Sequence, residues 1–339
     1  MDGILILHNS FGSPDDPLYA SRIGVMDQVG AVKRALDSLG MEAEVAAIED
    51  LNHLIQLLKI CRQSLVFNLI EEFIGSIEQA NYVPAICRAF GKSATGCDTP
   101  TLLIAQKKGQ AKALLQGAGL PCPDGAEIRP GRTLDAVHLP AGCYVLKPAW
   151  NDASEGISSD SVVSLPSEKD RAQDLLSELH RRFQQPVIVE RFIASRELNV
   201  SLMDRKNGVE VLTIAEISFS AFEEGRLRIV DYSAKWDENS FLFKNTPRKI
   251  PADLDRRDWK RIEELALSAW NTLGCRDYAR VDFRLDEQDR PYILEVNPNP
   301  DISPDAGFAA ALRAAEISYG DFVRDMLSNA GRRLEKAVA

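Results

Sequence analysis

Two strand-like segments near the C-terminus constrain the fold most strongly, because together they indicate a hairpin with a polar face. The segments are "YARVDFRL" (278–285) and "YILEVN" (292–297), and the turn-like "DEQDRP" between them favours antiparallel pairing. Successive side chains alternate between the two faces of a strand. We expect Leu294 on the apolar face. The opposite face then carries Arg280, Asp282, Glu295 and Asn297.

The polar face of this hairpin suits a divalent metal ion. Two carboxylates held close together in a poorly solvated site are unfavourable unless a cation neutralises them or one takes up a proton. Oxygen ligands of this kind suit Mg²⁺, which completes its octahedron with water and nucleotide phosphates. Asp282, Glu295 and Asn297 are therefore candidate metal ligands. The alternative is a solvated strand face with an ion pair to Arg280.

A lysine at the end of an apolar strand is a candidate phosphate contact. Lys147 follows "YVL" and precedes Pro148, so we expect its ammonium to emerge beside buried surface. Lysines placed in this way often bind phosphates as point charges. The following loop, "NDASEGIS", contains small residues that let backbone N–H groups approach an anion. A solvated lysine followed by an ordinary turn is the alternative.

A second strand end has acidic residues that could border a nucleotide pocket. In "VIVERFIASREL", Glu190 follows an apolar strand directly and Glu197 comes seven residues later. Ribose hydroxyls and an adenine edge need hydrogen-bond partners at the border of an apolar slot. Glu190, Glu197 and the backbone of residues 191–193 could supply them. Surface ion pairs are the alternative reading of these two glutamates.

The chain divides into three regions by its pattern of short apolar runs. Residues 1–100 alternate strand-like and helical segments, which predicts a parallel α/β domain. We expect a central domain at 101–190, opening with one helix up to the "GAGLP" stop signal. Residues 191–339 are predicted to form an antiparallel α+β domain, with a hairpin turn at Asn207-Gly208 and two closing helices. The fold class is thus α/β, with α+β character in the C-terminal part.

Composition excludes several classes of function. The 339 residues carry a formal net charge of -10, which argues against general binding to nucleic acid or to anionic membranes. Six scattered cysteines form no CxxC pair, so we interpret them as reduced and mostly buried. No apolar stretch reaches membrane length, and we expect a cytoplasmic protein.

The motifs, taken in order, resemble those of ATP-grasp ligases, and more closely those of the D-alanine-D-alanine ligase group. The resemblance covers roughly residues 105–328. The matching pieces are "AQKKGQAKALLQGAGLP", "VLKPAWNDASEGIS", "VIVERFIASREL", "VDYSAKWDENS", "YARVDFRLD", "YILEVNPNP" and, more loosely, "ISYGDFVRDML". The resemblance implies a three-part architecture, with residues 1–100 on the substrate side and ATP between the central and C-terminal domains.

The resemblance also implies roles for individual residues on the nucleotide side. Lys108 and Lys147 would contact ATP phosphates, and Ser154 would belong to the flexible loop that closes over them. The residues implied for the adenosine pocket are Glu190, Arg191, Ile193 and Glu197.

At the reacting centre, the resemblance implies a metal-assisted transfer. Asp282, Glu295 and Asn297 would hold two Mg²⁺ ions, with Mn²⁺ as a substitute. Arg280 would stabilise the phosphoryl group or the tetrahedral intermediate. Lys235 would contact the transferred phosphoryl group from the long polar loop at about 218–254, which we interpret as a lid.

The implied reaction is ATP-dependent activation of a carboxylate to an acyl phosphate, followed by attack of an amine to form an amide. The substrate side departs from the group. Ala306 stands where a serine holds the second substrate's carboxylate, Asp301 replaces a glycine, and Ala153 replaces a serine of the small loop. Glu71 and Glu72 could receive a substrate ammonium, or they could form a solvated acidic helix start.

We therefore predict an ATP-grasp ligase with altered substrate-side residues that joins a small carboxylic acid or amino acid to an amine. Two alternatives stay open. One is an ATP-binding regulatory or partner-binding protein without turnover, and the other is a true D-alanine-D-alanine ligase. We expect small-molecule substrates and no nucleic acid or membrane partner, and a homodimer is left open.

Overall fold

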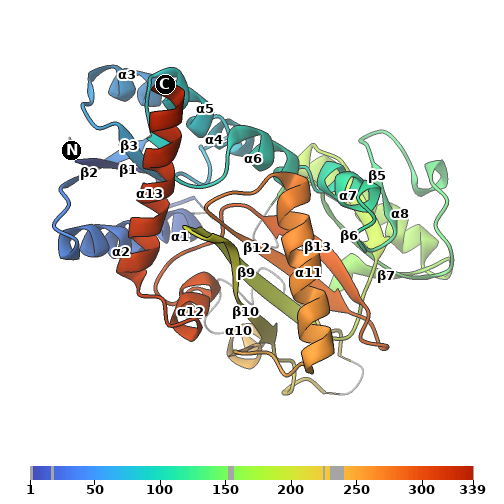
Figure 1. Cartoon of the computed structure of the whole chain (residues 1–339). Helices are drawn as coiled ribbons and strands as arrows, with labels where there is room; N and C mark the ends of the chain where they lie inside the picture. The colour runs from blue at the N-terminus through green and yellow to red at the C-terminus, as the bar shows by residue number, and fades with distance from the viewer. Residues whose placement is uncertain (1–2, 17–18, 152–155, 224–225, 230–239, 339) are drawn as a thin grey trace.

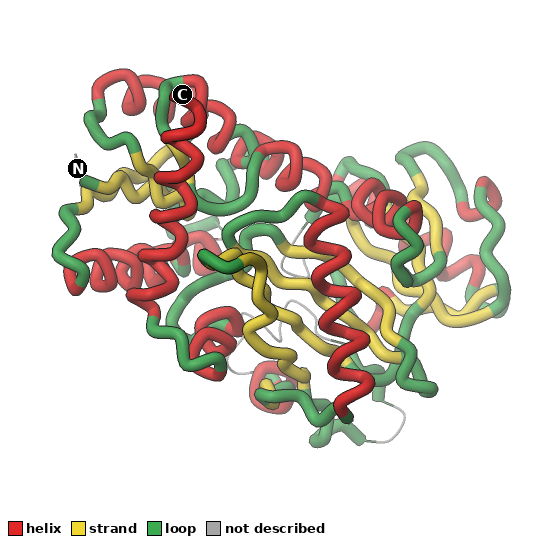
Figure 2. The backbone as a smooth tube through the Cα atoms, viewed as in Figure 1, coloured by secondary structure: helices red, strands yellow, loops and turns green. Residues whose placement is uncertain are grey.

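The computed structural model describes residues 3–16, 19–151, 156–223, 226–229 and 240–338. Its strands form three separate sheets, which follow one another along the chain (Figures 1 and 2). Helices cover the sheets, so the predicted α/β class is confirmed. In the described part of the chain, no helix combines the length and the apolar character that crossing a membrane requires.

The N-terminal sheet is parallel, as predicted, with strand order β2-β1-β3-β4. Its core strands β1 and β3 are buried almost throughout, as is typical of a sheet covered by helices on both faces. The two-residue β4 was not predicted. The strands are β1 (Ile4–Asn9), β2 (Ala43–Ile48), β3 (Leu65–Leu69) and β4 (Ser93–Ala94), and the helices are α1 (Tyr19–Ile23), α2 (Val25–Ser38), α3 (Leu51–Ile60), α4 (Ile77–Ala80) and α5 (Val83–Ala89).

The second sheet is antiparallel and has the order β5-β8-β6-β7. Helix α8 packs against β6, β7 and β8 through its apolar stripe, which includes Ala172, Leu176 and Leu179. The short strand β5 was not predicted. The elements are β5 (Gly125–Ile128), β6 (Gly142–Pro148), β7 (Val162–Leu165), α8 (Lys169–Phe183) and β8 (Val187–Arg191).

The third sheet is antiparallel, with the order β11-β10-β9-β12-β13. Strands β9 and β10 meet at Asn207-Gly208, as predicted, and Gly208 has a φ of +119° that only glycine adopts readily. Helix α11 crosses one face of this sheet (Figure 1) and buries Trp270 in its core. The elements are β9 (Glu197–Arg205), β10 (Gly208–Ile217), α10 (Phe241–Asn245), β11 (Arg248–Lys249), α11 (Arg256–Leu273), β12 (Tyr278–Leu285) and β13 (Pro291–Asn297).

The predicted single helix before "GAGLP" is wrong, because two helices occupy this segment. Helix α6 (Thr99–Gln106) and helix α7 (Lys108–Gly117) are separated at Lys107, whose ψ of +81° is not helical. Both helices contact α11 and β13 of the third sheet. The break turns the start of α7 toward the cavity described below, which Lys108 lines.

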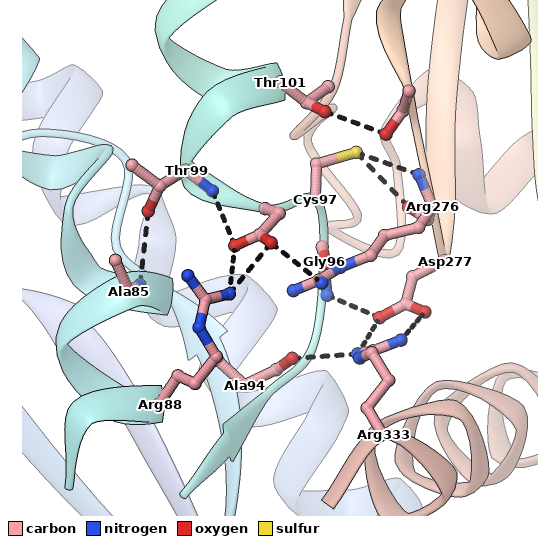
Figure 3. Close-up of polar contacts among 12 residues, drawn as sticks. Ala85, Arg88, Ala94, Gly96, Cys97, Thr99, Thr101, Arg276, Asp277 and Arg333 are labelled. Atoms are coloured by element: carbon pink, nitrogen blue, oxygen red, sulfur yellow. Dashed lines mark hydrogen bonds and ion pairs between the residues drawn. The ribbon is translucent and has the colours of Figure 1, made fainter. Parts of the chain in front are cut away.

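A buried carboxylate connects the N-terminal region to the C-terminal one. Asp277 is fully buried and accepts hydrogen bonds from the backbone N–H of Gly96 at 2.8 Å and from both terminal nitrogens of Arg333 at 2.7 and 2.8 Å (Figure 3). Arg333 also donates to the carbonyl of Ala94. Arg333 lies on α13 (Tyr319–Val338). Helices α12 (Gly307–Ala314) and α13 are the two predicted closing helices. Asp277 therefore fixes α13 and the end of β4 beside β12.

Candidate active site

One cavity of about 910 Å³ is lined by strands of all three sheets. The N-terminal sheet contributes Asn9 and Asn68, the second sheet contributes Lys147 and Glu190, and the third sheet contributes strands β9, β10, β12 and β13. The volume lies within the range of about 300–1,000 Å³ that is typical of small-molecule sites. A site of this size between three structural units can hold two or more small molecules.

The hairpin β12–β13 presents its polar face to this cavity. Arg280 lies opposite Asn297, and Asp282 lies opposite Glu295 in the strand register. All four side chains line the cavity, so the structure brings together the residues that the alternation predicted. The prediction for Leu294 is wrong: a bulge makes it an extra residue in β13, and it lines the cavity too.

Arg280 and Asp282 form a bidentate ion pair within this face. The Nε and a terminal nitrogen of Arg280 donate to the two carboxylate oxygens at 2.7 and 2.8 Å, and Asn199 on β9 donates to the same carboxylate at 2.8 Å. Burial opposes the charge of the Arg280 guanidinium, but Asp282 outweighs it and raises the pKa of Arg280. The ion pair to Arg280 that we gave as the alternative is thus present, inside the cavity rather than on a solvated face.

The donor set on this face fits Mg²⁺ in chemical type. Glu295 is 34% exposed, and its Oε2 lies 3.8 Å from the Nζ of Lys108. Asn297 uses its amide oxygen to accept from the backbone N–H of Asn299 at 3.0 Å. Among the described residues, no three His, Cys, Asp or Glu side chains gather around one point. Two carboxylates and an amide suit an ion that takes few protein ligands and fills its shell with water and phosphate oxygens. Metal binding here stays a prediction.

Two lysines surround a buried glutamate that also lines the cavity. Glu190 is 2% exposed; its two carboxylate oxygens lie 2.8 Å from the Nζ of Lys112 and 2.6 Å from the Nζ of Lys147. Burial raises the pKa of Glu190, but the two ammonium groups outweigh burial and hold this pKa below its ordinary value. Burial lowers the pKa of Lys147. Lys108 donates to the carbonyl of Asn151 at 2.6 Å, at the entrance to the small-residue loop.

The residues predicted for the adenosine pocket all line the cavity. Arg191 donates to the carbonyl of Ala141 at 2.9 Å, and Glu197 lies 2.9 Å from Arg284. Ile193 follows the end of β8. Nucleotide contacts by these residues stay a prediction. Ser154 and Lys235, two further predicted site residues, lie outside the described residues.

Three residues that join these contacts were not predicted from the sequence. Lys112 lies four residues after Lys108 on α7, so one helical turn places both on the same buried face. Arg284 continues the alternation of Arg280 and Asp282 along β12, and Asn199 lies opposite Asp282 on β9. The helical spacing and the strand alternation are signals that could have identified Lys112 and Arg284. Identifying Asn199 from the sequence would have required knowledge of the strand order.

The N-terminal end of the cavity is polar and rich in carboxylates. Arg22 is 7% exposed and pairs with Asp16 and Glu72 at 2.6 Å each. Gln28 donates to Glu71 at 2.7 Å. Glu71 and Glu72 line the cavity from a loop after β3, so the alternative of an acidic helix start is wrong; α4 begins only at Ile77. This end of the cavity suits a substrate that carries a positive charge.

Lysines and carboxylates line one cavity of this three-sheet fold, and together with the family match they define an ATP-grasp carbon-nitrogen ligase. Residues 133–328 match the family model described as the D-ala D-ala ligase C-terminus, which is more than half of the chain. The protein belongs to this D-alanine-D-alanine ligase family. The resemblance inferred from the motifs is therefore confirmed.

Similar proteins agree with this assignment. D-alanine-D-alanine ligase B of Chromobacterium violaceum is 29% identical over 264 residues, which cover 77% of this chain and 78% of that protein. A D-alanine-D-alanine ligase of Sinorhizobium fredii is 25% identical over 329 residues, covering 96% and 97%. The crystal structure of D-alanine-D-alanine ligase from Bacillus anthracis complexed with ATP matches 99% of both chains with a TM-score of 0.74 and 19% identity, which shows a common fold.

Proposed function

We propose that this protein uses ATP and Mg²⁺ to join a carboxylate to an amine through an acyl phosphate. The observation that carries the proposal is the cavity itself, where the polar face of β12–β13 and the lysines of α7 and β6 line one space. Phosphoryl transfer depends mainly on positioning and on neutralising negative charge, and these residue types supply both. Family membership supports the same reaction type.

The nucleotide and the metal would be held by different residues of the cavity. Lys108 and Lys147 would contact the phosphates, and Asp282, Glu295 and Asn297 would hold two Mg²⁺ ions. Bound Mg²⁺ would offset the charge of the phosphate oxygens. The predicted adenosine residues Glu190, Arg191, Ile193 and Glu197 line the cavity next to Lys147, and their roles toward the nucleotide are part of this proposal.

The reaction is balanced in two steps. In the first, a carboxylate oxygen of one substrate bonds to the γ-phosphorus and the bond to ADP breaks. In the second, the amine nitrogen bonds to the acyl carbon, phosphate leaves and the nitrogen loses a proton. The Arg280 guanidinium, fixed by Asp282, would stabilise negative charge at the reacting centre, and Lys235 would assist from the long loop. Exclusion of water from the cavity would protect the acyl phosphate.

The substrates would be small amino acids or related compounds. Three of the similar proteins bear the name D-alanine-D-alanine ligase, which makes D-alanine the first substrate to test. Ala306 and Asp301, which depart from the group, and the carboxylates at the N-terminal end favour a different pair. A cytoplasmic location and a homodimer stay predictions from the sequence.

The test traps the acyl phosphate with hydroxylamine. The protein is incubated with MgATP, hydroxylamine and D-alanine, or with a pool of amino and carboxylic acids, and hydroxamates are identified by mass spectrometry. We expect a hydroxamate and ADP that both require the carboxylate. Lys147→Met should abolish the product, whereas Lys169→Met, at an exposed lysine of α8, should not. Binding of MgATP without ADP release in any mixture would instead support the regulatory alternative.

A further inference from the structure

We propose, on the basis of the proposed ligase function, that Arg248 binds a carboxylate of the amine substrate. The acceptor would then be an amino acid or a peptide with a free carboxyl group. Arg248 is the first residue of β11 and lines the same cavity as Arg280. It was not among the residues predicted from the sequence.

Two neighbours hold the Arg248 guanidinium at the wall of the cavity. A terminal nitrogen donates to the carbonyl of Asp305 at 3.0 Å. Gly307, the first residue of α12, lies next to the guanidinium, because a Cβ added at Gly307 would lie 3.7 Å from the same terminal nitrogen. The backbone pairing of Ile217 with Arg248 joins β11 to β10. These contacts place the guanidinium, although Arg248 as a whole residue is exposed.

Arg248 and Arg191 are the described cations of the cavity lining that have no carboxylate partner, and Arg191 donates to the carbonyl of Ala141 instead. In the described part of the chain, no carboxylate lies within ion-pair distance of Arg248. Asp301, which lies near it, accepts hydrogen bonds from the backbone N–H and the hydroxyl of Ser303 at 2.8 and 2.6 Å. The remaining described cations of the lining form the ion pairs Lys108–Glu295, Lys147–Glu190, Arg280–Asp282, Arg284–Glu197 and Arg22 with Asp16 and Glu72.

The electrostatic surroundings favour an anion beside Arg248. Burial and the positive charge of Arg280 lower the pKa of Arg248, and the negative charges of Asp305 and Asp301 do not compensate. The aligned peptide dipoles of α12 add a small positive potential at its N-terminus, and its first turn contains no acidic residue to offset it. A substrate carboxylate would supply the missing negative charge, and a guanidinium matches its geometry with two parallel hydrogen bonds.

The position of Arg248 agrees with the chemistry of the second step. The amine must attack an acyl carbon beside Arg280, and in an α-amino acid a single carbon separates the amine from the carboxylate. Arg248 is close enough to Arg280 for their charges to interact. Ala306, the N-cap residue of α12, offers no side-chain hydrogen bond at this point. Near the start of α12, Arg248 is therefore the residue that would contact the carboxylate of the amine substrate.

The test compares acceptors with and without a carboxylate, using the donor that the hydroxamate assay identifies. A pool of amino acids and a pool of the corresponding amino-acid amides serve as acceptors, and hydroxylamine serves as an acceptor without a carboxylate. We expect the native enzyme to prefer acids over amides by about 10- to 100-fold in kcat/KM, as for a hydrogen bond to a charged group. Arg248→Gln should lose this preference and keep its hydroxamate rate and its KM for ATP.

Two further variants control for general effects. Lys249→Gln changes the next residue, which is exposed and paired with Asp253 outside the cavity, and it should behave like the native enzyme. Arg248→Lys should restore part of the preference, because it keeps the charge and loses the bidentate geometry.

Several results would overturn the role of Arg248. These are equal use of acids and amides by the native enzyme, an unchanged preference in Arg248→Gln, and hydroxamate formation without condensation to either pool. A parallel loss of hydroxamate formation and condensation in Arg248→Gln would place this residue on the phosphate side instead. Failure of the native enzyme to form any hydroxamate would refute the proposed function itself, so the two failures are distinguishable.

Discussion

Replacing Glu190 by glutamine tests whether the negative charge of this side chain, rather than its shape, stabilises its contacts with Lys112 and Lys147. Glutamine keeps the size of the side chain and removes its negative charge. Glu190 is 2% exposed, and Lys112 and Lys147 are each 9% exposed, so the change would leave two poorly solvated ammonium groups with no counter-charge between them. We expect the free energy of unfolding to fall.

The size of the loss follows from this burial. Removing one partner of a buried ion pair destabilises proteins by about 3–5 kcal/mol. The burial that lowers the pKa of Lys147 lets this lysine release its proton in the variant, which limits the cost. We therefore expect a loss of about 3 kcal/mol, at the lower end of that range. Asp135→Asn, which removes an exposed partner of Lys169, is the control and should leave stability unchanged.

The pH dependence of the stability difference between the native protein and Glu190→Gln distinguishes a loss of charge from a change of shape. The pKa of Glu190 in the folded protein lies below its ordinary value of 4.5. Its stabilising contribution is therefore fully present above pH 4.5 and disappears as the pH falls through the folded pKa. Urea unfolding of both proteins from about pH 7 to about pH 3 should show a constant difference that shrinks at the acidic end. A difference that is absent near neutrality, or the same at every pH, would refute the reasoning.

Two further predictions concern the body of the protein. Asp277→Asn removes the charge that binds Arg333, and we expect the free energy of unfolding in urea to fall by about 2–4 kcal/mol. Asp325→Asn, at a partly exposed ion pair, should lower it clearly less. Equal losses in the two variants would contradict the assigned role of Asp277. In thiol labelling of the folded protein, the exposed Cys143 should react first. Cys87 should stay unmodified, because burial raises its pKa to about 12. Early labelling of Cys87 in peptide mass spectra would contradict this burial.

The strand pairs that position the site could be predicted from local patterns. Alternation of polar and apolar residues over 280–285 in β12 and 295–297 in β13 places Asp282 and Glu295 on one face, and their register in the sheet agrees. The turn at Asn207-Gly208 indicated the hairpin β9–β10 in the same way. These features depend on residues close together in sequence, where period and turn chemistry are decisive.

Contacts between distant segments could not be predicted in this way. Lys112 and Glu190 are far apart in sequence and form an ion pair only because α7 packs beside β8 at the cavity. The bulge at Leu294 depends on how β13 pairs with β12, and no single residue in the sequence indicates it. The break at Lys107 has neither proline nor glycine to mark it, since Gly109 lies inside the next helix. Tertiary packing determines all three features.

The most direct test of the account is whether Asp282 and Glu295 make nucleotide binding dependent on Mg²⁺. ATP is titrated calorimetrically into the native protein and into an Asp282→Asn, Glu295→Gln double variant, with and without Mg²⁺. Glu210→Gln, at an exposed ion pair of β10, is the control. We predict that Mg²⁺ tightens ATP binding in the native protein and in the control, and that the double variant loses most of this increment. An equal Mg²⁺-dependent increment in all three proteins would contradict the account.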